Sequence, residues 1–260
     1  MGIRKDEKLN RLLRMAPEGV AIPSPWLTAQ GYSRQLIRKY VQSGWLVALG
    51  SRGVYAHPGS PVEGEGVLLG LQHLGGFDLY SGGVSALERQ GYAHYLSLGG
   101  NARMDIWGRD KPPQWLSELD LSPPWSFHRR QLFLTDPEGG WVDLPTKIRD
   151  WTLRVSAPER ALLEVLSEVD ETPASFIHVA ELFEGLSTAR PSVVTALLRA
   201  CKHCKAKRLF LFFGAHYQHG WFKKVDDAGI DLGKGKRVIT RGGKFDKRFQ
   251  ITVPEAFHAG

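Results

Sequence analysis

The side chains best suited to binding a polyanion are long donors gathered on one short segment, residues 33–43, "SRQLIRKYVQS". Its apolar residues recur at helical spacing and share one face of the predicted helix. The opposite face carries Ser33, Arg34, Gln35, Arg38, Lys39 and Gln42. In the major groove of DNA, Arg pairs bidentately with guanine and Gln with adenine. This pattern is typical of a helix that contacts base edges.

A predicted β-hairpin follows this helix. The stretches "WLVAL" and "GVYAH" alternate like strands, and Gly50 and Gly53 bracket the turn between them. The turn holds Arg52. A cation at a hairpin tip can reach a phosphate or the minor groove, so Arg52 is expected to contact the DNA backbone.

Three helices position these residues. Helical spacing covers residues 5–15, a second helix is expected over 24–30, and the third runs from an N-cap at Ser33 to a stop at Gly44. Three helices and a hairpin within 60 residues predict a winged helix-turn-helix. The alternative is a helical hairpin with an ordinary charged face. Spacing, caps and sign of charge together favour DNA binding.

The charge of the chain is uneven. The net charge is +7, and residues 201–250 hold thirteen Lys or Arg against four Asp or Glu. Two basic ends around a mildly acidic middle indicate contact with a polyanion at both ends, with a solvated cationic surface as the alternative. Two cysteines in 260 residues fit a reducing compartment, and no apolar run is long enough for a membrane helix. We therefore expect a cytoplasmic protein.

The remaining sequence predicts an α+β fold. The stretch 57–66, "HPGSPVEGEG", is rich in Pro and Gly and is typical of a linker. It divides the chain into a winged-helix domain, residues 1–60, and a larger mixed α+β domain, residues 61–260, which is long enough to fold alone. In the second domain, Ser156 and Glu159 form a predicted capping box. Helices are expected near 174–185, 191–203 and 205–219.

Motifs for catalysis or metal binding are weak. The sequence has no P-loop, no G-x-S-x-G and no H-E-x-x-H. "DLGKGKR" could cradle a phosphate through its backbone, but it lacks the Walker spacing, which favours a basic turn. Cys201, Cys204, His216 and His219 approach a zinc-finger count. However, a helical context favours buried free thiols, so we expect neither a metal nor a cofactor.

Several stretches together resemble the AbiEi family of antitoxins from type IV toxin–antitoxin, or abortive-infection, systems. They are "GYSRQLIRKYVQSGWL", "RGVY", "SALERQGYAHYL", "VSAPERALLEVL", "KRLFLFF" and "IDLGKGKRVITRGGKFDKRFQITVPE". The resemblance implies an N-terminal winged helix that represses its own operon by binding inverted repeats in the promoter, with two copies per operator. It also implies a C-terminal domain that counteracts a nucleotidyltransferase-type toxin without a stable complex, as part of phage defence.

No motif defines the antitoxic residues. The best candidates are the cations of the basic region: Lys205, Lys207, Arg208, Lys223, Lys224, Lys234, Lys236 and Arg237. The resemblance implies a nucleoid-associated cytoplasmic regulator with no catalysis and no membrane contact. The alternative is an enzyme acting on nucleic acid, with the winged helix as its targeting module.

Overall fold

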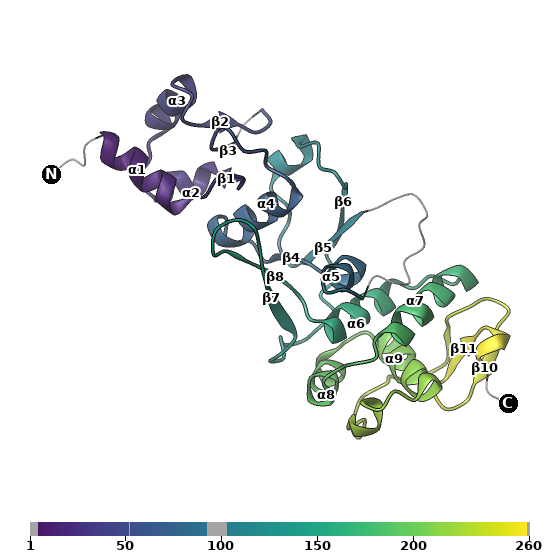
Figure 1. Ribbon diagram of the computed structural model, residues 1–260. Helices are drawn as coiled ribbons and strands as arrows, with labels where there is room; N and C mark the ends of the chain where they lie inside the picture. Colours follow the sequence, from purple (N-terminus) through teal and green to yellow (C-terminus); the bar gives the residue numbers. More distant parts are fainter. Residues whose placement is uncertain (1–4, 52, 93–102, 259–260) are drawn as a thin grey trace. The chain divides into compact units, whose positions relative to one another are not determined.

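The computed structural model describes residues 5–51, 53–92 and 103–258 (Figure 1). Helices and short strands alternate along the chain, so the α+β class is confirmed. The chain forms two compact units, each assembled from separate stretches of sequence. The first comprises residues 1–80, 102–129 and 143–154, and the second comprises residues 81–101, 130–142 and 155–260.

The first unit begins with a winged helix-turn-helix. Its helices are α1 (Lys5–Met15), α2 (Ser24–Ala29) and α3 (Arg34–Gln42), and its strands are β1 (Ile22–Pro23), β2 (Val47–Ala48) and β3 (Val54–Ala56). The strands form an antiparallel sheet of order β1-β3-β2. Three helices and a hairpin were the sequence prediction, and all of them are present.

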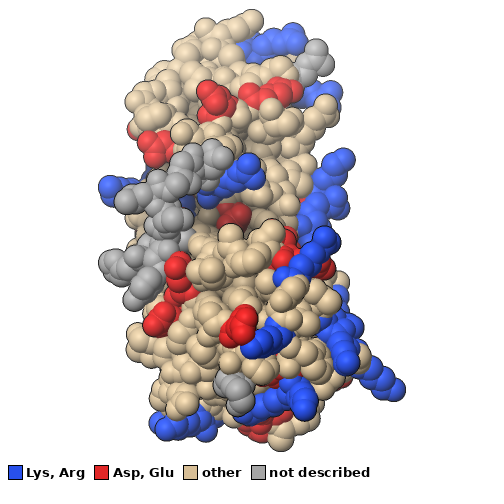
Figure 2. Space-filling model, turned by 90° about the vertical axis from the view of Figure 1, so that its right-hand side faces the viewer, with Lys and Arg blue, Asp and Glu red and all other residues tan. Residues whose placement is uncertain are grey.

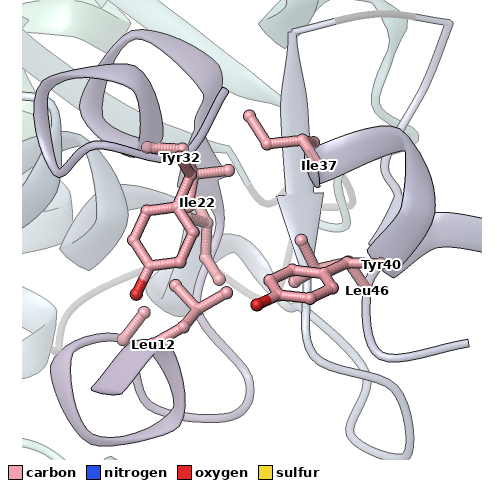
Figure 3. Packing of buried hydrophobic residues seen from close by; sticks show 8 residues of the cluster. Leu12, Ile22, Tyr32, Ile37, Tyr40 and Leu46 are labelled. Carbon is pink, nitrogen blue, oxygen red and sulfur yellow. The ribbon is translucent and has the colours of Figure 1, made fainter. Parts of the chain in front are cut away.

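A single apolar cluster holds these elements together (Figure 3). It contains Leu12 from α1, Ile22 from β1, Ile37 and Tyr40 from α3 and Leu46 from the start of the wing. Each of these side chains is at most 6% exposed. Burial of each one stabilises the fold by about 1.5–3 kcal/mol. The apolar face of α3 is thereby fixed inward, and its polar face must point away from the core.

The stretch 57–66 is not a free linker. His57 is 2% exposed, and its ring nitrogen Nε2 lies 2.9 Å from the carbonyl oxygen of Ala16. The hydroxyl of Ser60 donates to Glu18 at 2.9 Å. A Cβ on Gly66 would lie 1.8 Å from the carbonyl oxygen of Gly19. Pro and Gly serve here for close backbone packing, which composition cannot distinguish from flexibility.

The first unit continues beyond residue 60. It includes α4 (Gly64–Leu69), a π-helical turn (Gly70–Leu74) and a 3-10 helix (Gln114–Glu118). The chain also forms a five-stranded sheet of order β6-β5-β4-β8-β7, and residues 81, 141–142 and 155–156 of its strands are counted with the second unit. Its strands are β4 (Leu79–Ser81), β5 (Met104–Gly108), β6 (Trp125–His128), β7 (Trp141–Pro145) and β8 (Thr152–Ser156). The predicted domain boundary after residue 60 therefore remains a prediction. The division into compact units groups residues 61–80 with the winged helix.

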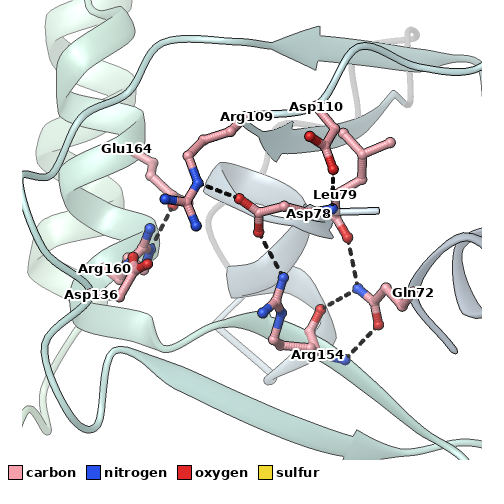
Figure 4. Close-up of polar contacts among 9 residues, drawn as sticks. All are labelled: Gln72, Asp78, Leu79, Arg109, Asp110, Asp136, Arg154, Arg160 and Glu164. Carbon is pink, nitrogen blue, oxygen red and sulfur yellow. Dashed lines mark hydrogen bonds and ion pairs between the residues drawn. The ribbon is translucent and has the colours of Figure 1, made fainter. Parts of the chain in front are cut away.

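A carboxylate just before β4 pairs with two arginines, one directly after β5 and one in β8 (Figure 4). Asp78 accepts from Arg109 at 2.6 Å and from Arg154 at 2.8 Å. Its backbone N–H donates to Asp110 at 2.7 Å. These contacts tie the end of β5 and strand β8 to β4.

The second unit is mainly helical. Its helices are α5 (Gly83–Arg89), α6 (Pro158–Glu168), α7 (Pro173–Gly185), α8 (Pro191–Ala200) and α9 (Cys204–Tyr217), followed by 3-10 helices at Phe222–Lys224 and Glu255–Phe257. A small sheet of order β10-β11-β9 lies near the C-terminus, with strands β9 (Arg237–Val238), β10 (Lys244–Asp246) and β11 (Ile251–Val253). Phenylalanines of α7 and α9 pack edge to face, as Phe183 and Phe210 do at 5.1 Å.

The predicted capping box at the start of α6 is wrong. The N-cap is Ala157, and the Ser156 hydroxyl instead donates to the buried carboxylate of Glu164 at 2.9 Å. Glu164 also accepts from Arg160, as drawn in Figure 4. Burial raises the pKa of Glu164. Both residues of the expected box bond elsewhere, because Glu159 pairs with Arg190 at 2.8 Å while Ser156 bonds Glu164. None of the helices in the described ranges has the length and apolar character needed to cross a membrane.

Candidate nucleic-acid interface

Local capping fixes where α3 begins and ends. The Ser33 hydroxyl accepts from the N–H of Leu36 at 3.2 Å, as predicted for an N-cap. Gly44 follows the helix with φ of +71°, a conformation that glycine adopts without strain. The helix is therefore fixed in register, with its N-terminal residues at the end where recognition helices contact bases.

The outer face of α3 carries the predicted donors. Ser33, Arg34, Gln35, Arg38, Lys39 and Gln42 are all exposed. Within the described residues, no carboxylate forms an ion pair with Arg34, Arg38 or Lys39. By contrast, Arg109, Arg154 and Arg160 are each paired with an acidic side chain. Unpaired cations keep their full charge for phosphate oxygens or base edges.

The wing is a short antiparallel hairpin. Val47 pairs with Ala56 and Ala48 with Tyr55, and the N–H of Leu49 donates to Val54 at 3.0 Å. Gly50 and Gly53 have φ of +70° and +86°, as the sequence predicts for a tight tip. Arg52, the predicted backbone contact, lies outside the described residues. Its role therefore remains a prediction.

A carboxylate that sequence reasoning missed lies against the wing tip. Glu118, from the 3-10 helix Gln114–Glu118, accepts from the N–H of Ser51 at 2.7 Å and from its hydroxyl at 2.6 Å. The two residues are 67 positions apart in sequence. No local pattern could reveal the pair, because it depends on the tertiary arrangement of the unit. The contact orders the tip and places a negative charge beside it.

Two exposed apolar side chains also lie next to α3. Trp45 is 48% exposed and Val47 is 39% exposed. Their positions in an alternating strand predict that one face points to solvent, but the sequence gives no reason for large apolar groups there. Together with the α3 donors they give this surface both polar and apolar contact groups.

Three of the eight cations predicted for the antitoxic patch are not free surface charges. Lys207 and Arg208 are 4% and 2% exposed, so their assignment to an exposed patch is wrong. Arg208 donates to four backbone carbonyls, those of Leu232, Gly233, Gly235 and Gln250. Lys205 is half-buried, its ammonium group donates to the carbonyl of Val169, and burial lowers its pKa. The sequence spacing of Lys205, Lys207 and Arg208 on a helix does not show whether their side chains are buried or form an exposed cationic face.

The other five cations are exposed: Lys223, Lys224, Lys234, Lys236 and Arg237. The first two belong to the 3-10 helix Phe222–Lys224, Lys234 and Lys236 lie on the loop that leads into β9, and Arg237 is the first residue of β9. Figure 2 shows one face of the molecule, on which Asp and Glu lie among the Lys and Arg side chains. On that face the cations therefore do not form one uninterrupted field.

The four residues of the possible zinc site lie at opposite ends of α9. Cys201 directly follows α8 and Cys204 begins α9, whereas His216 lies in the last turn of α9 and His219 just beyond it. Twelve residues of helix span about 18 Å, too far for four ligands of one ion. Burial raises the pKa of Cys201 to about 11, so its thiol stays protonated at neutral pH.

Comparisons with known proteins agree with these elements. A family model described as the N-terminal domain of the AbiEi antitoxin transcriptional regulators matches residues 5–98. A second, described as transcriptional regulator, AbiEi antitoxin, type IV TA system, matches residues 101–254. The crystal structure of the RV2827C protein from Mycobacterium tuberculosis is 17% identical, covers 95% of this chain and 89% of that chain, and superposes with a TM-score of 0.51. At this identity the likeness shows a shared fold only. No curated protein matches the chain. The two family models together cover nearly all of the chain, which therefore belongs to the AbiEi antitoxin family, the transcriptional regulators of type IV toxin–antitoxin systems.

Proposed function

We propose that the winged helix binds double-stranded DNA in the promoter of its own operon and represses it. The observation that carries this proposal is the outer face of α3, where Arg34, Arg38 and Lys39 are exposed and have no acidic partner in the described part of the chain. A capped helix with donors near its N-terminus fits the major groove, and the adjacent hairpin fits the flanking backbone.

The operator that suits this interface is an inverted repeat. A two-fold pair of winged helices presents two copies of α3, and two such helices fit half-sites one helical turn apart, about 34 Å. Two copies of the chain would then occupy one operator. In this proposal the protein works in the cytoplasm, on the nucleoid, and performs no catalysis.

Titrations with operator DNA and with random DNA test whether α3 contacts base edges. The Arg34→Ala variant should lose about 1–3 kcal/mol of operator affinity and less of its affinity for random DNA, because a lost base contact matters only at the correct sequence. Fluorescence anisotropy at fixed salt measures both affinities. The matched control is Arg14→Ala, which removes an exposed arginine from α1. An equal loss of affinity for the two DNAs would show that Arg34 contacts a phosphate and not a base.

We also propose that the C-terminal part counteracts a nucleotidyltransferase-type toxin without forming a stable complex with it. Lys223, Lys224, Lys234, Lys236 and Arg237 are the candidates, because they are exposed. The proposal draws support from family membership and from the excess of positive charge in residues 201–250.

Co-expression of toxin and full-length antitoxin tests this second role. Charge reversal at Lys234, Lys236 and Arg237 should reduce rescue of growth while leaving folding intact, because exposed charges contribute little to stability. The control reverses Lys202, an exposed lysine outside the candidate set. Full rescue by the triple variant, with its circular dichroism unchanged, would remove these three residues from the mechanism.

A further inference from the structure

The loop before β9 has glycines of positive φ at alternate positions. It runs "DLGKGKR" from Asp231 to Arg237. Gly233 and Gly235 have φ of +68° and +78°, whereas neither Lys234 nor Lys236 has a positive φ. A bend in which residues of positive φ alternate with others can direct successive N–H groups toward one concave side. Such a concavity is an anion-binding nest.

The buried side chain of Arg208 binds the backbone of this loop. Its guanidinium group donates to the carbonyl oxygens of Leu232 at 2.8 Å, Gly233 at 2.9 Å and Gly235 at 2.6 Å. It also bonds Gln250, whose carbonyl accepts the N–H of Arg237 as well. The loop is therefore fixed to α9 and to the small sheet by a buried cation.

These bonds set the direction of the loop's amide groups. In a trans peptide the N–H of each residue points opposite to the carbonyl of the residue before it. The carbonyls of Gly233 and Gly235 point toward Arg208, so the N–H groups of Lys234 and Lys236 point away from it. In the described part of the chain, neither N–H has a hydrogen-bond partner, and the same holds for the N–H of Gly235.

Side-chain charge favours an anion at the same place. Lys234, Lys236 and Arg237 are exposed, and the Lys236 ammonium lies 4.8 Å from the centre of the Phe245 ring. The Asp231 carboxylate, which accepts the N–H of Gly233 at 2.8 Å, opposes an anion. Three cations outweigh this carboxylate.

We propose that the loop from Gly233 to Arg237 is a binding site for a phosphate group, held by the N–H groups of Lys234 and Lys236 and by their ammonium groups. The site differs from a P-loop, because it lacks the Walker spacing and its backbone is organised by Arg208. The proposal goes beyond DNA repression and antitoxicity, since it assigns a ligand chemistry that needs neither operator nor toxin for its test. A phosphate group could belong to a free polyphosphate or nucleotide, or to a nucleic-acid backbone.

An amide-resolved NMR titration of the full-length protein with sodium triphosphate tests the site. Binding should shift the amide resonances of Lys234 and Lys236, relative to a titration with sodium chloride at equal ionic strength. Gly235→Ala should weaken binding about tenfold, because φ of +78° is strained for alanine while all the charges remain. A Cβ at Gly235 would meet its nearest neighbour, Arg237, at 3.7 Å, an ordinary contact, so steric clash is not the cause.

The matched control is Gly229→Ala. Gly229 has φ of +75°, and a Cβ there would have no neighbour within 4 Å, so this variant introduces the same kind of strain outside the nest. Its affinity for triphosphate should equal that of the wild type. A second variant, Asp231→Asn, should bind several-fold more tightly, because it removes a charge that opposes the anion.

The outcomes separate a nest from a simple cluster of lysines. If Gly235→Ala binds as tightly as Gly229→Ala while Lys234→Ala and Lys236→Ala bind weakly, charge alone is responsible and the nest is wrong. Absence of shifts at both lysine amides would also overturn the proposal. A parallel titration with a single-stranded oligonucleotide that lacks terminal phosphates identifies the source. Shifts with triphosphate alone indicate a free polyphosphate, and shifts with both indicate a nucleic-acid backbone.

Discussion

At the scale of single residues, the arginines of this protein have two distinct roles. Arg34 and Arg38 are exposed on α3. Arg160 is buried between the rings of Phe133 and Trp141, at 4.4 Å and 3.8 Å, and pairs with Glu164. A guanidinium group can serve either role, because its planar face packs on aromatic rings while its edge donates hydrogen bonds.

The sequence predicts the first role but not the second. Arg34 and Arg38 follow an N-cap on a short amphipathic helix, so their exposure can be read from neighbouring residues. Arg208 also lies on a helix, but it is buried by the loop at residues 232–235, which is more than twenty positions away. Burial by a distant segment leaves no local signature. The prediction that Arg208 was exposed failed for this reason.

Glu118 provides a prediction at the same scale. Its carboxylate holds Ser51 at the wing tip and places a negative charge near the DNA backbone expected there. Glu118→Gln keeps an acceptor and removes the charge. Affinity for operator and random DNA should therefore rise about two- to fivefold at low salt, and the gain should fade near 0.5 M salt, where screening is strong. Anisotropy titrations over a salt series measure this.

Glu118→Ala separates charge from positioning. It removes the same charge but also both hydrogen bonds to Ser51, so the wing tip loses its support. If the tip contacts DNA, this variant should bind more weakly than Glu118→Gln. Equal affinities for the two variants would show that the order of the tip contributes nothing to binding.

At the scale of elements, local signals explain which parts were predictable. The bounds of α1 and α3 and the two strands of the wing follow from apolar spacing, an N-cap and paired glycines, all within a few residues. Strands β4, β7 and β10 were missed. Short strands depend on partners far along the chain, and their own sequences carry little periodicity.

His57 links the winged helix to the stretch that follows it, and this contact should depend on pH. Burial lowers the pKa of His57 and outweighs the hydrogen bond from its Nε2 to Ala16, which acts in the opposite direction, so the native fold favours the neutral ring. A group whose pKa is lower in the folded state binds its proton more tightly when unfolded. Its contribution is therefore intact above its unfolded pKa, about 6.5, and is lost as the pH falls toward its folded pKa.

Urea unfolding at pH 7.5 and pH 5.5 tests this expectation. The wild type should lose more stability between the two pH values than His57→Gln, whose amide can still donate to Ala16 but does not titrate. His203 has a pKa lowered mainly by burial and also by nearby Arg130 and Lys205, so some pH dependence should persist in both proteins. An equal loss in the two proteins would show that His57 is not part of the pH response.

At the scale of the whole molecule, the compact units do not follow the order of the sequence. The first unit combines the winged helix with residues from three separate stretches. A division at the Pro- and Gly-rich stretch was a reasonable prediction from composition, because such stretches often separate domains. Within that unit, residues 1–60 pack against the residues that follow them. We therefore expect a chain without residues 1–60 to be less stable.

The last prediction concerns a chain that begins at Val62. In the intact protein, a Cβ on Gly66 would meet Gly19 at 1.8 Å and one on Gly70 would meet Ala21 at 2.0 Å, and the N–H of Ala21 donates to Gly66 at 3.2 Å. Removing residues 1–61 would expose this closely packed face of α4. We expect the shortened chain to bind a hydrophobic dye and to melt at least several degrees below the intact protein. A Tm equal to that of the full-length chain, without dye binding, would show that residues 62–260 fold independently.

If the shortened chain is unstable, its failure to rescue cells would not identify antitoxic residues. Full-length chains with paired substitutions on α3 or on the loop before β9 would then be needed to separate repression from antitoxicity.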